Sequence, residues 1–168
     1  MSIENARVDE RLIHGQVAMV WTNTIGATRI IVVNNEAVKD ESIIAALKIS
    51  KPAGVKLSIL SKEKAIDKFK NNIYDEDKIF LITKNISDMK DIIQGGLPIK
   101  VVNIGNIAKK EGSIQIKKSV SLTEDDINLI KTLIDDGIKV TAQMIPNESD
   151  QSIEIYLKNN LLGEKYKQ

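Results

Sequence analysis

Apolar residues in the first two thirds of the chain alternate between short continuous runs and stretches with helical spacing. The runs at 30–33 and 79–82 are continuously apolar, as in strands buried on both faces, and 55–60 and 100–104 predict two further strands. Helical spacing is carried by Val17, Val20 and Trp21, by Ile43, Ile44 and Leu47, by Ala65, Ile66 and Phe69, and by Met89, Ile92 and Ile93. We therefore predict an α/β fold: a mainly parallel open sheet flanked by helices.

The pattern changes in the last third of the chain. Apolar residues spaced two apart predict antiparallel edge strands or a hairpin; these residues are Ile114, Ile116, Val120 and Leu122. Thr123 and Asp126 have the spacing of a capping box at the start of a helix. Apolar alternation over 138–144 predicts a strand that Pro146 ends. A final helix is predicted from Ile153, Tyr156, Leu157 and Leu161.

Length and composition limit the classes of function. The 168 residues contain no linker or repeat, so 1–168 is predicted to be one domain. The net charge of +1 gives no reason to expect a nucleic acid partner. Without cysteine, and with a single histidine, an ordinary zinc site or thiol chemistry is excluded. No apolar stretch approaches the ~18 residues of a membrane span, and the first residues lack a signal-peptide pattern. We expect a cytoplasmic protein that needs no metal and no cofactor.

His14 is the candidate with the most informative surroundings. A single histidine is more often a surface or core residue than a catalyst, so its position carries the argument. It lies just before a predicted helix that Gly15 and Gln16 open, where free backbone N–H groups attract an anion. Gly15 would let a tetrahedral group approach the backbone, and Arg11 could hold phosphate oxygens with two parallel hydrogen bonds. These are the parts that a phosphorylated histidine needs.

Residues 7–17, Arg-Val-Asp-Glu-Arg-Leu-Ile-His-Gly-Gln-Val, resemble the active-site loop of the mannose/fructose/sorbose-type IIB subunits of the bacterial phosphotransferase system. The resemblance continues through Trp21 and residues 29–34, and it returns at 102–105 and 119–123. It implies a subunit that takes a phosphoryl group from a IIA subunit and passes it to a sugar that enters through the membrane subunits IIC and IID. It also implies a location at the inner face of the membrane, held there by the partner subunits. A non-catalytic regulatory or binding module of the same fold is the alternative. The sugar and any homo-oligomer stay open.

The resemblance implies a role for each residue of the loop. His14 would be the nucleophile, and Arg11, Gly15 and Gln16 would bind the phosphoryl group. Asp9 would orient Arg11, because a carboxylate too close to phosphate would repel it. The ion pair of Arg11 with Asp9 or Glu10 is also the simplest alternative to a role in catalysis. Arg7 is either a second cation or the partner of an acid outside the loop.

Other polar residues are expected near His14, because open α/β sheets bind ligands at the carboxyl ends of their strands. They are Asn34, Thr83, Lys84, Asn103 and Gly105, and for each of them ordinary loop chemistry is an equally good explanation. Over 103–112 the resemblance is imperfect: Asn106 replaces a glycine, and Lys110 stands near the usual arginine without its planar fork. Contact between this loop and phosphate is therefore left open. Trp21 is expected in the core rather than as a platform for sugar.

Overall fold

The computed structural model describes residues 2–158, and its centre is a six-stranded sheet in the order β3-β2-β4-β1-β5-β8. All neighbouring strands of this sheet are parallel. The strands are β1 (Ser2–Asp9), β2 (Arg29–Val33), β3 (Lys56–Leu60), β4 (Lys78–Thr83), β5 (Val101–Asn106) and β8 (Lys139–Thr141). The predicted mainly parallel α/β architecture is confirmed.

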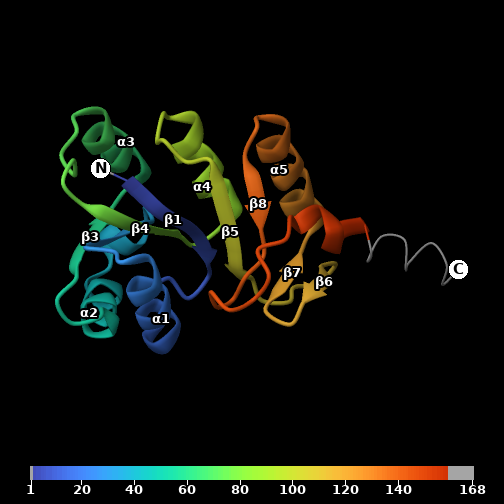
Figure 1. Cartoon of the computed structure of the whole chain (residues 1–168), viewed down its shortest axis with the longest axis horizontal. Helices are drawn as coiled ribbons and strands as arrows, with labels where there is room; N and C mark the ends of the chain where they lie inside the picture. Colours follow the sequence, from blue (N-terminus) through green and yellow to red (C-terminus); the bar gives the residue numbers. More distant parts are fainter. Residues whose placement is uncertain (1, 159–168) are drawn as a thin grey trace, which may run out of the picture.

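Helices cover both faces of the sheet (Figure 1). One face carries α1 (Gly15–Ile25) and α2 (Glu41–Ser50), and the opposite face carries α3 (Lys62–Lys70), α4 (Ile86–Gln94) and α5 (Glu124–Asp135). A 3-10 turn, η1 (Ala37–Lys39), precedes α2. β1 leads into α1 and the neighbouring β4 leads into α4, so the loops after these two strands turn to opposite faces of the sheet. Open α/β sheets bind ligands at such a switch point, outside the carboxyl ends of the strands.

Local sequence explains where the helices begin and end. Helices α2, α3 and α4 each begin at an N-cap residue whose side chain accepts hydrogen bonds from backbone N–H groups of the first turn. These residues are Asp40, Ser61 and Asn85. Thr123 and Asp126 form the predicted capping box of α5. Gly26, in the left-handed conformation at φ 65°, ends α1.

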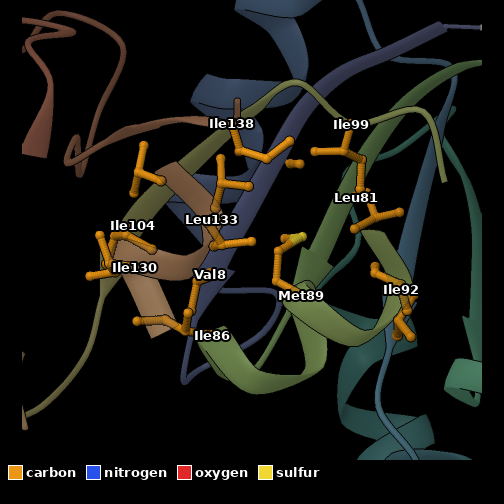
Figure 2. Close-up of a cluster of buried hydrophobic side chains, with 14 of the residues drawn as sticks. Val8, Leu81, Ile86, Met89, Ile92, Ile99, Ile104, Ile130, Leu133 and Ile138 are labelled. Carbon is orange, nitrogen blue, oxygen red and sulfur yellow. The ribbon is translucent and has the colours of Figure 1, made fainter. Parts of the chain in front are cut away.

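The core lies in two layers. On the α3–α5 face, apolar side chains from β1, β4 and β5 pack against α4 and α5. Figure 2 shows Val8, Leu81, Met89, Ile104 and Leu133 in this cluster. On the opposite face, apolar side chains of β2 and β4 pack beneath Ala18 and Trp21 of α1 and Leu47 of α2. Trp21 is thus a core residue, as predicted.

The antiparallel pair in the last third is present as β6 (Ile114–Lys117) and β7 (Val120–Leu122). It forms a sheet of its own, while β8 takes the edge of the main sheet by parallel pairing with β5. Val120 and Leu122 are buried in the core that α5 covers. The capping box therefore follows directly on a strand that is anchored by its own apolar side chains.

Two details differ from the sequence prediction. Val20 is 44% exposed, and the buried face of α1 is formed by Ala18, Trp21 and Thr22 instead. β8 ends at Thr141 rather than at 144, because the Gln143 N–H donates to the side chain of Asn103 and the chain leaves the sheet. The last described residues are helical over 153–158, as predicted, and Leu161 lies outside the described residues.

Candidate functional site

His14 follows β1 in a short, tightly folded loop. The Leu12 N–H donates to the Asp9 carbonyl (2.9 Å), and Leu12 has a φ of 59°, which is uncommon for a residue with a side chain. Leu12 and Ile13 are buried in the core beneath α1, so their side chains hold the loop in this conformation. The loop is therefore anchored directly before an exposed histidine.

His14 occupies the N-cap position of α1 and is exposed. Its carbonyl accepts the first helical hydrogen bond, from the Ala18 N–H (2.9 Å), and no side chain caps the helix. The N–H groups of Gly15, Gln16 and Val17 therefore have no acceptor within the helix. A Cβ on Gly15 would meet no atom within 4 Å, so the protein's own packing does not require a glycine there.

Asp9 is the centre of the charged groups in this loop. Its side chain is 1% exposed and accepts three hydrogen bonds from Arg11: from the backbone N–H (2.9 Å), Nε (3.1 Å) and Nη2 (3.0 Å). Arg11 is 28% exposed, and its Nη1 has no protein partner among residues 2–158. Asp9 thus fixes the guanidinium of Arg11 while leaving one of its edges available.

Arg7 reaches the same carboxylate from inside the protein. Its Nε and Nη2 each donate to Asp9 Oδ2 (3.3 Å), and its side chain is 1% exposed. Burial lowers the pKa of Arg7 below its ordinary value, and the neighbouring Asp9 carboxylate opposes this shift. Of the two alternatives for Arg7, the pairing with an acid outside the loop is not found: Arg7 pairs with Asp9, the acid two residues further along β1. Because its side chain is buried, Arg7 cannot contact a ligand at the surface directly, and it can act on one only through Asp9.

Two further elements close around Arg7. The Arg7 guanidinium lies over the ring of Trp21 (5.6 Å to the centroid), and its Nη1 donates to the carbonyl of Gln143 (2.9 Å). A Cβ on Gly105 would lie 2.1 Å from Arg7 Cζ, so only glycine leaves room for the guanidinium. The indole N–H of Trp21 donates to the carbonyl of Met144 (2.9 Å).

Sequence reasoning missed the segment after β8, residues 142–148. Gln143 and Met144 act through backbone groups, which no side-chain pattern reveals. Glu148 contributes its side chain: it forms an ion pair with Lys117 of β6 and accepts from the Met144 N–H (3.3 Å). The apolar alternation over 138–144 gave the opposite signal, that of a continuing strand.

Two of the other polar residues predicted near His14, at the carboxyl ends of the strands, bond within their own loops through their side chains. The Asn34 side chain accepts from the N–H groups of Glu36 (3.1 Å) and Ala37 (2.8 Å), and Thr83 donates to the Asn85 carbonyl (2.8 Å). Lys84 is exposed. Asn103 and Gly105 do belong to the site's support, through Gln143 and Arg7 respectively.

The loop over 106–112 is attached to the histidine loop by Glu10. The Glu10 carboxylate pairs with Lys110 and accepts from the Ala108 N–H (3.1 Å), and its backbone N–H donates to the Asn106 carbonyl (3.1 Å). Lys110 is therefore engaged by an acid of the histidine loop. Residues 2–158 contain no cluster of acidic and histidine side chains able to hold a metal ion. Within this range no helix is long and apolar enough to cross a membrane.

Comparison with known proteins gives the family. Residues 3–167 match the family model described as "PTS system sorbose subfamily IIB component". The sorbose-specific EIIB component of Lacticaseibacillus casei is 39% identical over 94% of this chain and 95% of its own. The fructose-specific EIIB component of Bacillus subtilis is 36% identical over 95% of this chain and 98% of its own.

Solved structures agree with the sequence comparison. The crystal structure of the IIBSor domain of the sorbose permease from Klebsiella pneumoniae superposes with a TM-score of 0.89 at 33% identity, covering 95% of this chain and 98% of that one. The fold, the histidine loop and these matches agree along nearly the whole chain. The chain belongs to the sorbose subfamily of IIB components of the sugar phosphotransferase system.

Proposed function

We propose that this chain is the phosphocarrier of a sugar uptake system, accepting a phosphoryl group on His14 from a IIA subunit and passing it to a sugar at IIC and IID membrane subunits. The observation that carries the proposal is the geometry after β1. An exposed histidine stands at an uncapped helix N-terminus, three residues after an arginine that a buried carboxylate holds in place.

The transfer needs a neutral imidazole. One ring nitrogen of His14 attacks the phosphorus of a phosphohistidine on IIA in line, so that a new N–P bond forms as the donor's N–P bond breaks. The second transfer breaks this bond in favour of an O–P bond to a sugar hydroxyl, whose proton leaves. Neither step requires a cofactor or a metal.

Two groups of the protein stabilise the negative charge of the phosphoryl oxygens. The free N–H groups at the start of α1, including those of Gly15 and Gln16, attract the phosphoryl oxygens, and the open space at Gly15 lets them approach. Arg11 supplies a cation whose position is set before the phosphoryl group arrives, because Asp9 already holds its Nε and Nη2. Asp9 and Arg7 act through Arg11 and are positioning residues.

Partners of this kind fit the surface beside His14. On α1, the helix whose N-cap is His14, Met19 is 51% exposed and Val20 is 44% exposed. A surface that must bind a donor subunit and a membrane complex in turn combines apolar and charged groups. The mannose-specific EIIAB component of Escherichia coli, 34% identical over 88% of this chain and 46% of its own length, carries A and B in one name, which supports IIA as the donor. We place the chain in the cytoplasm, at the membrane through these partners.

A reconstituted relay tests the proposal. The chain is incubated with phosphoenolpyruvate, the general phosphotransferase proteins and a matching IIA, then with membranes that contain IIC and IID and with a panel of sugars. We expect one phosphoryl group per chain and phosphorylation of one sugar class, both lost in His14→Gln. Labelling without transfer to any sugar of the panel would instead indicate the regulatory module.

A further inference from the structure

The segment after β8 is closed by an ion pair between Glu148 and Lys117 of β6. The Glu148 carboxylate also accepts from the Met144 N–H (3.3 Å), and the Glu148 carbonyl accepts from the side chain of Gln143 (2.8 Å). Lys117 donates in turn to the carbonyl of Ala142 (2.9 Å), at the start of the segment. Because both charged side chains are partly buried, water and salt screen this pair less than an exposed one.

One peptide group of this segment is hydrogen-bonded to charged side chains at both ends. The peptide group that joins Gln143 to Met144 accepts at its carbonyl from Arg7 Nη1 (2.9 Å), and its N–H donates to Glu148 Oε2. Because the N–H and C=O of a trans peptide point in opposite directions, Arg7 and Glu148 lie on opposite sides of this group. Charged side chains of alternating sign are therefore connected in one row: Lys117, Glu148, Arg7, Asp9 and Arg11.

A carboxylate at the N–H end of a peptide group makes the carbonyl at the other end a stronger acceptor, because hydrogen bonds in such a chain polarise one another. Here the donor to that carbonyl is a buried cation. Burial lowers the pKa of Arg7, and the charges of the Asp9 and Glu148 carboxylates both oppose this shift. The charge of Glu148 therefore helps to keep Arg7 protonated and in place.

We propose that Glu148 is a positioning residue for phosphoryl transfer, which acts on Arg7 through the peptide group that follows Gln143. Arg7 donates two hydrogen bonds to Asp9 Oδ2, the same oxygen that accepts from Arg11 Nη2. When Arg7 is held firmly, this oxygen is fixed, and with it the guanidinium of Arg11. The effect on transfer rests on the proposed function, whereas the link from Glu148 to Arg11 does not.

NMR of the arginine side chains tests this link without any phosphoryl donor. The chain has only three arginines, Arg7, Arg11 and Arg29, so three Nε–H signals report on the whole protein. Arg29 donates its Nε–H to Asp77, outside the row of charges, and is an internal reference. We expect Glu148→Gln to shift the Nε–H signal of Arg7 and, less strongly, that of Arg11, and to leave that of Arg29 unchanged.

The choice of variants separates the charge of Glu148 from its role in the shape of the segment. Glu148→Gln removes the charge but keeps an oxygen that can accept from the Met144 N–H. Lys117→Met leaves Glu148 this hydrogen bond but removes the cation that holds it, so it should shift the same two arginine signals less. Asp91→Asn removes the acid of another partly exposed pair, that of Lys62 with Asp91, and should shift none of them.

Transfer kinetics test the consequence of the link. In single-turnover labelling by phospho-IIA, Glu148→Gln should lower the maximal rate about threefold to tenfold, because Arg11 is still present but less well fixed. The IIA concentration that gives half of this rate should not change, and Asp91→Asn should label as fast as the wild type. Unshifted Arg7 and Arg11 signals in Glu148→Gln would overturn the link, whether or not IIA labels the chain. Shifted signals with a wild-type maximal rate would overturn the role of Glu148 in transfer.

Discussion

One row of residues crosses the sheet and divides its α1/α2 face into two unlike halves. Val32 of β2 pairs with Ile82 of β4, which pairs with Arg7 of β1, then Asn103 of β5 and Thr141 of β8. The first two are sealed beneath helices in an apolar cluster. The last three are buried too, yet they are charged or polar. The change occurs between β4 and β1, the strand that leads to His14.

The difference shows what a site of this kind requires. The apolar half is stabilised by burial alone, which is roughly proportional to area and needs no particular partner. The polar half needs specific partners, because each buried donor or acceptor without one is costly. Around Arg7 these partners are the ring of Trp21, the space left by Gly105 and the carbonyl of Gln143. The result is a fixed carboxylate, Asp9, able to hold a surface arginine.

The largest expected effects come from one variant in each half. Phe80→Ala in the apolar half should reduce the free energy of unfolding by about 3–5 kcal/mol through the cavity it creates. Asp9→Asn should cost a similar ~3–5 kcal/mol because it leaves Arg7 buried without its counter-charge. Denaturant unfolding measures both.

Only one of these two variants should affect phosphoryl transfer. At temperatures where both are folded, Asp9→Asn should slow the labelling of the chain by phospho-IIA, since Arg11 loses its anchor, whereas Phe80→Ala should not. Equal labelling rates in the two variants would remove the distinction between the halves.

Two glycines, one beside Arg7 and one beside His14, should respond in opposite ways to the same change. Gly105→Ala forces a methyl group into the guanidinium of Arg7 and should destabilise the fold by about 1–3 kcal/mol. Gly15→Ala places a methyl group in open space in the first turn of α1 and should leave stability unchanged or raise it by up to ~1 kcal/mol. Thermal unfolding of both variants tests the packing around Arg7, and equal stabilities would contradict it.

Arg11→Lys should slow phosphoryl transfer about tenfold to a hundredfold without unfolding the chain. Lysine keeps the charge but cannot hold Asp9 with two nitrogens while it faces a phosphoryl group. A lost charge-assisted contact of about 1.5–3 kcal/mol corresponds to this change in rate. Rapid-quench labelling by phospho-IIA is the measurement. A rate equal to the wild type would mean that Arg11 does not contact the phosphoryl group.

The smallest effect on stability is expected at Asp77, which forms an ion pair with Arg29 at the edge of the apolar half. Burial raises the pKa of Asp77, but hydrogen bonds from Arg29 and Thr28 and the charges of Arg29 and Lys56 outweigh it, so the pKa lies below its ordinary value. The stabilisation is therefore complete above about pH 4 and is lost as the pH falls through the lowered pKa. Unfolding curves between neutral and acidic pH should show a shallower acid loss in Asp77→Asn than in the wild type. An identical acid profile would contradict the assignment.

The sequence predicted the apolar half better than the polar half. Continuous runs at 30–33 and 79–82 correctly indicated strands buried on both faces, because burial acts on side chains that can be read directly. In the polar half, the sequence left open whether Arg7 is a second cation or pairs with an acid outside the loop, and it did not predict the pair with Asp9. The strand over 138–144 was expected to be longer. Backbone groups of Gln143 contribute to both outcomes, since its carbonyl accepts from Arg7 and its N–H donates to Asn103 where the chain leaves the sheet. Backbone groups carry no residue-specific signal. The positions of His14 and Arg11 followed from the loop motif, and their roles stay predictions.

Mapping of the phosphoryl group tests the central claim most directly. The chain is labelled by phospho-IIA and digested under basic conditions, in which a phosphohistidine survives, and the phosphopeptide is sequenced by mass spectrometry. We predict a single acid-labile, base-stable phosphoryl group in the peptide that contains residues 12–17, on His14, and no label in His14→Gln. A phosphoryl group on any other residue, or a label that survives in His14→Gln, would contradict the account.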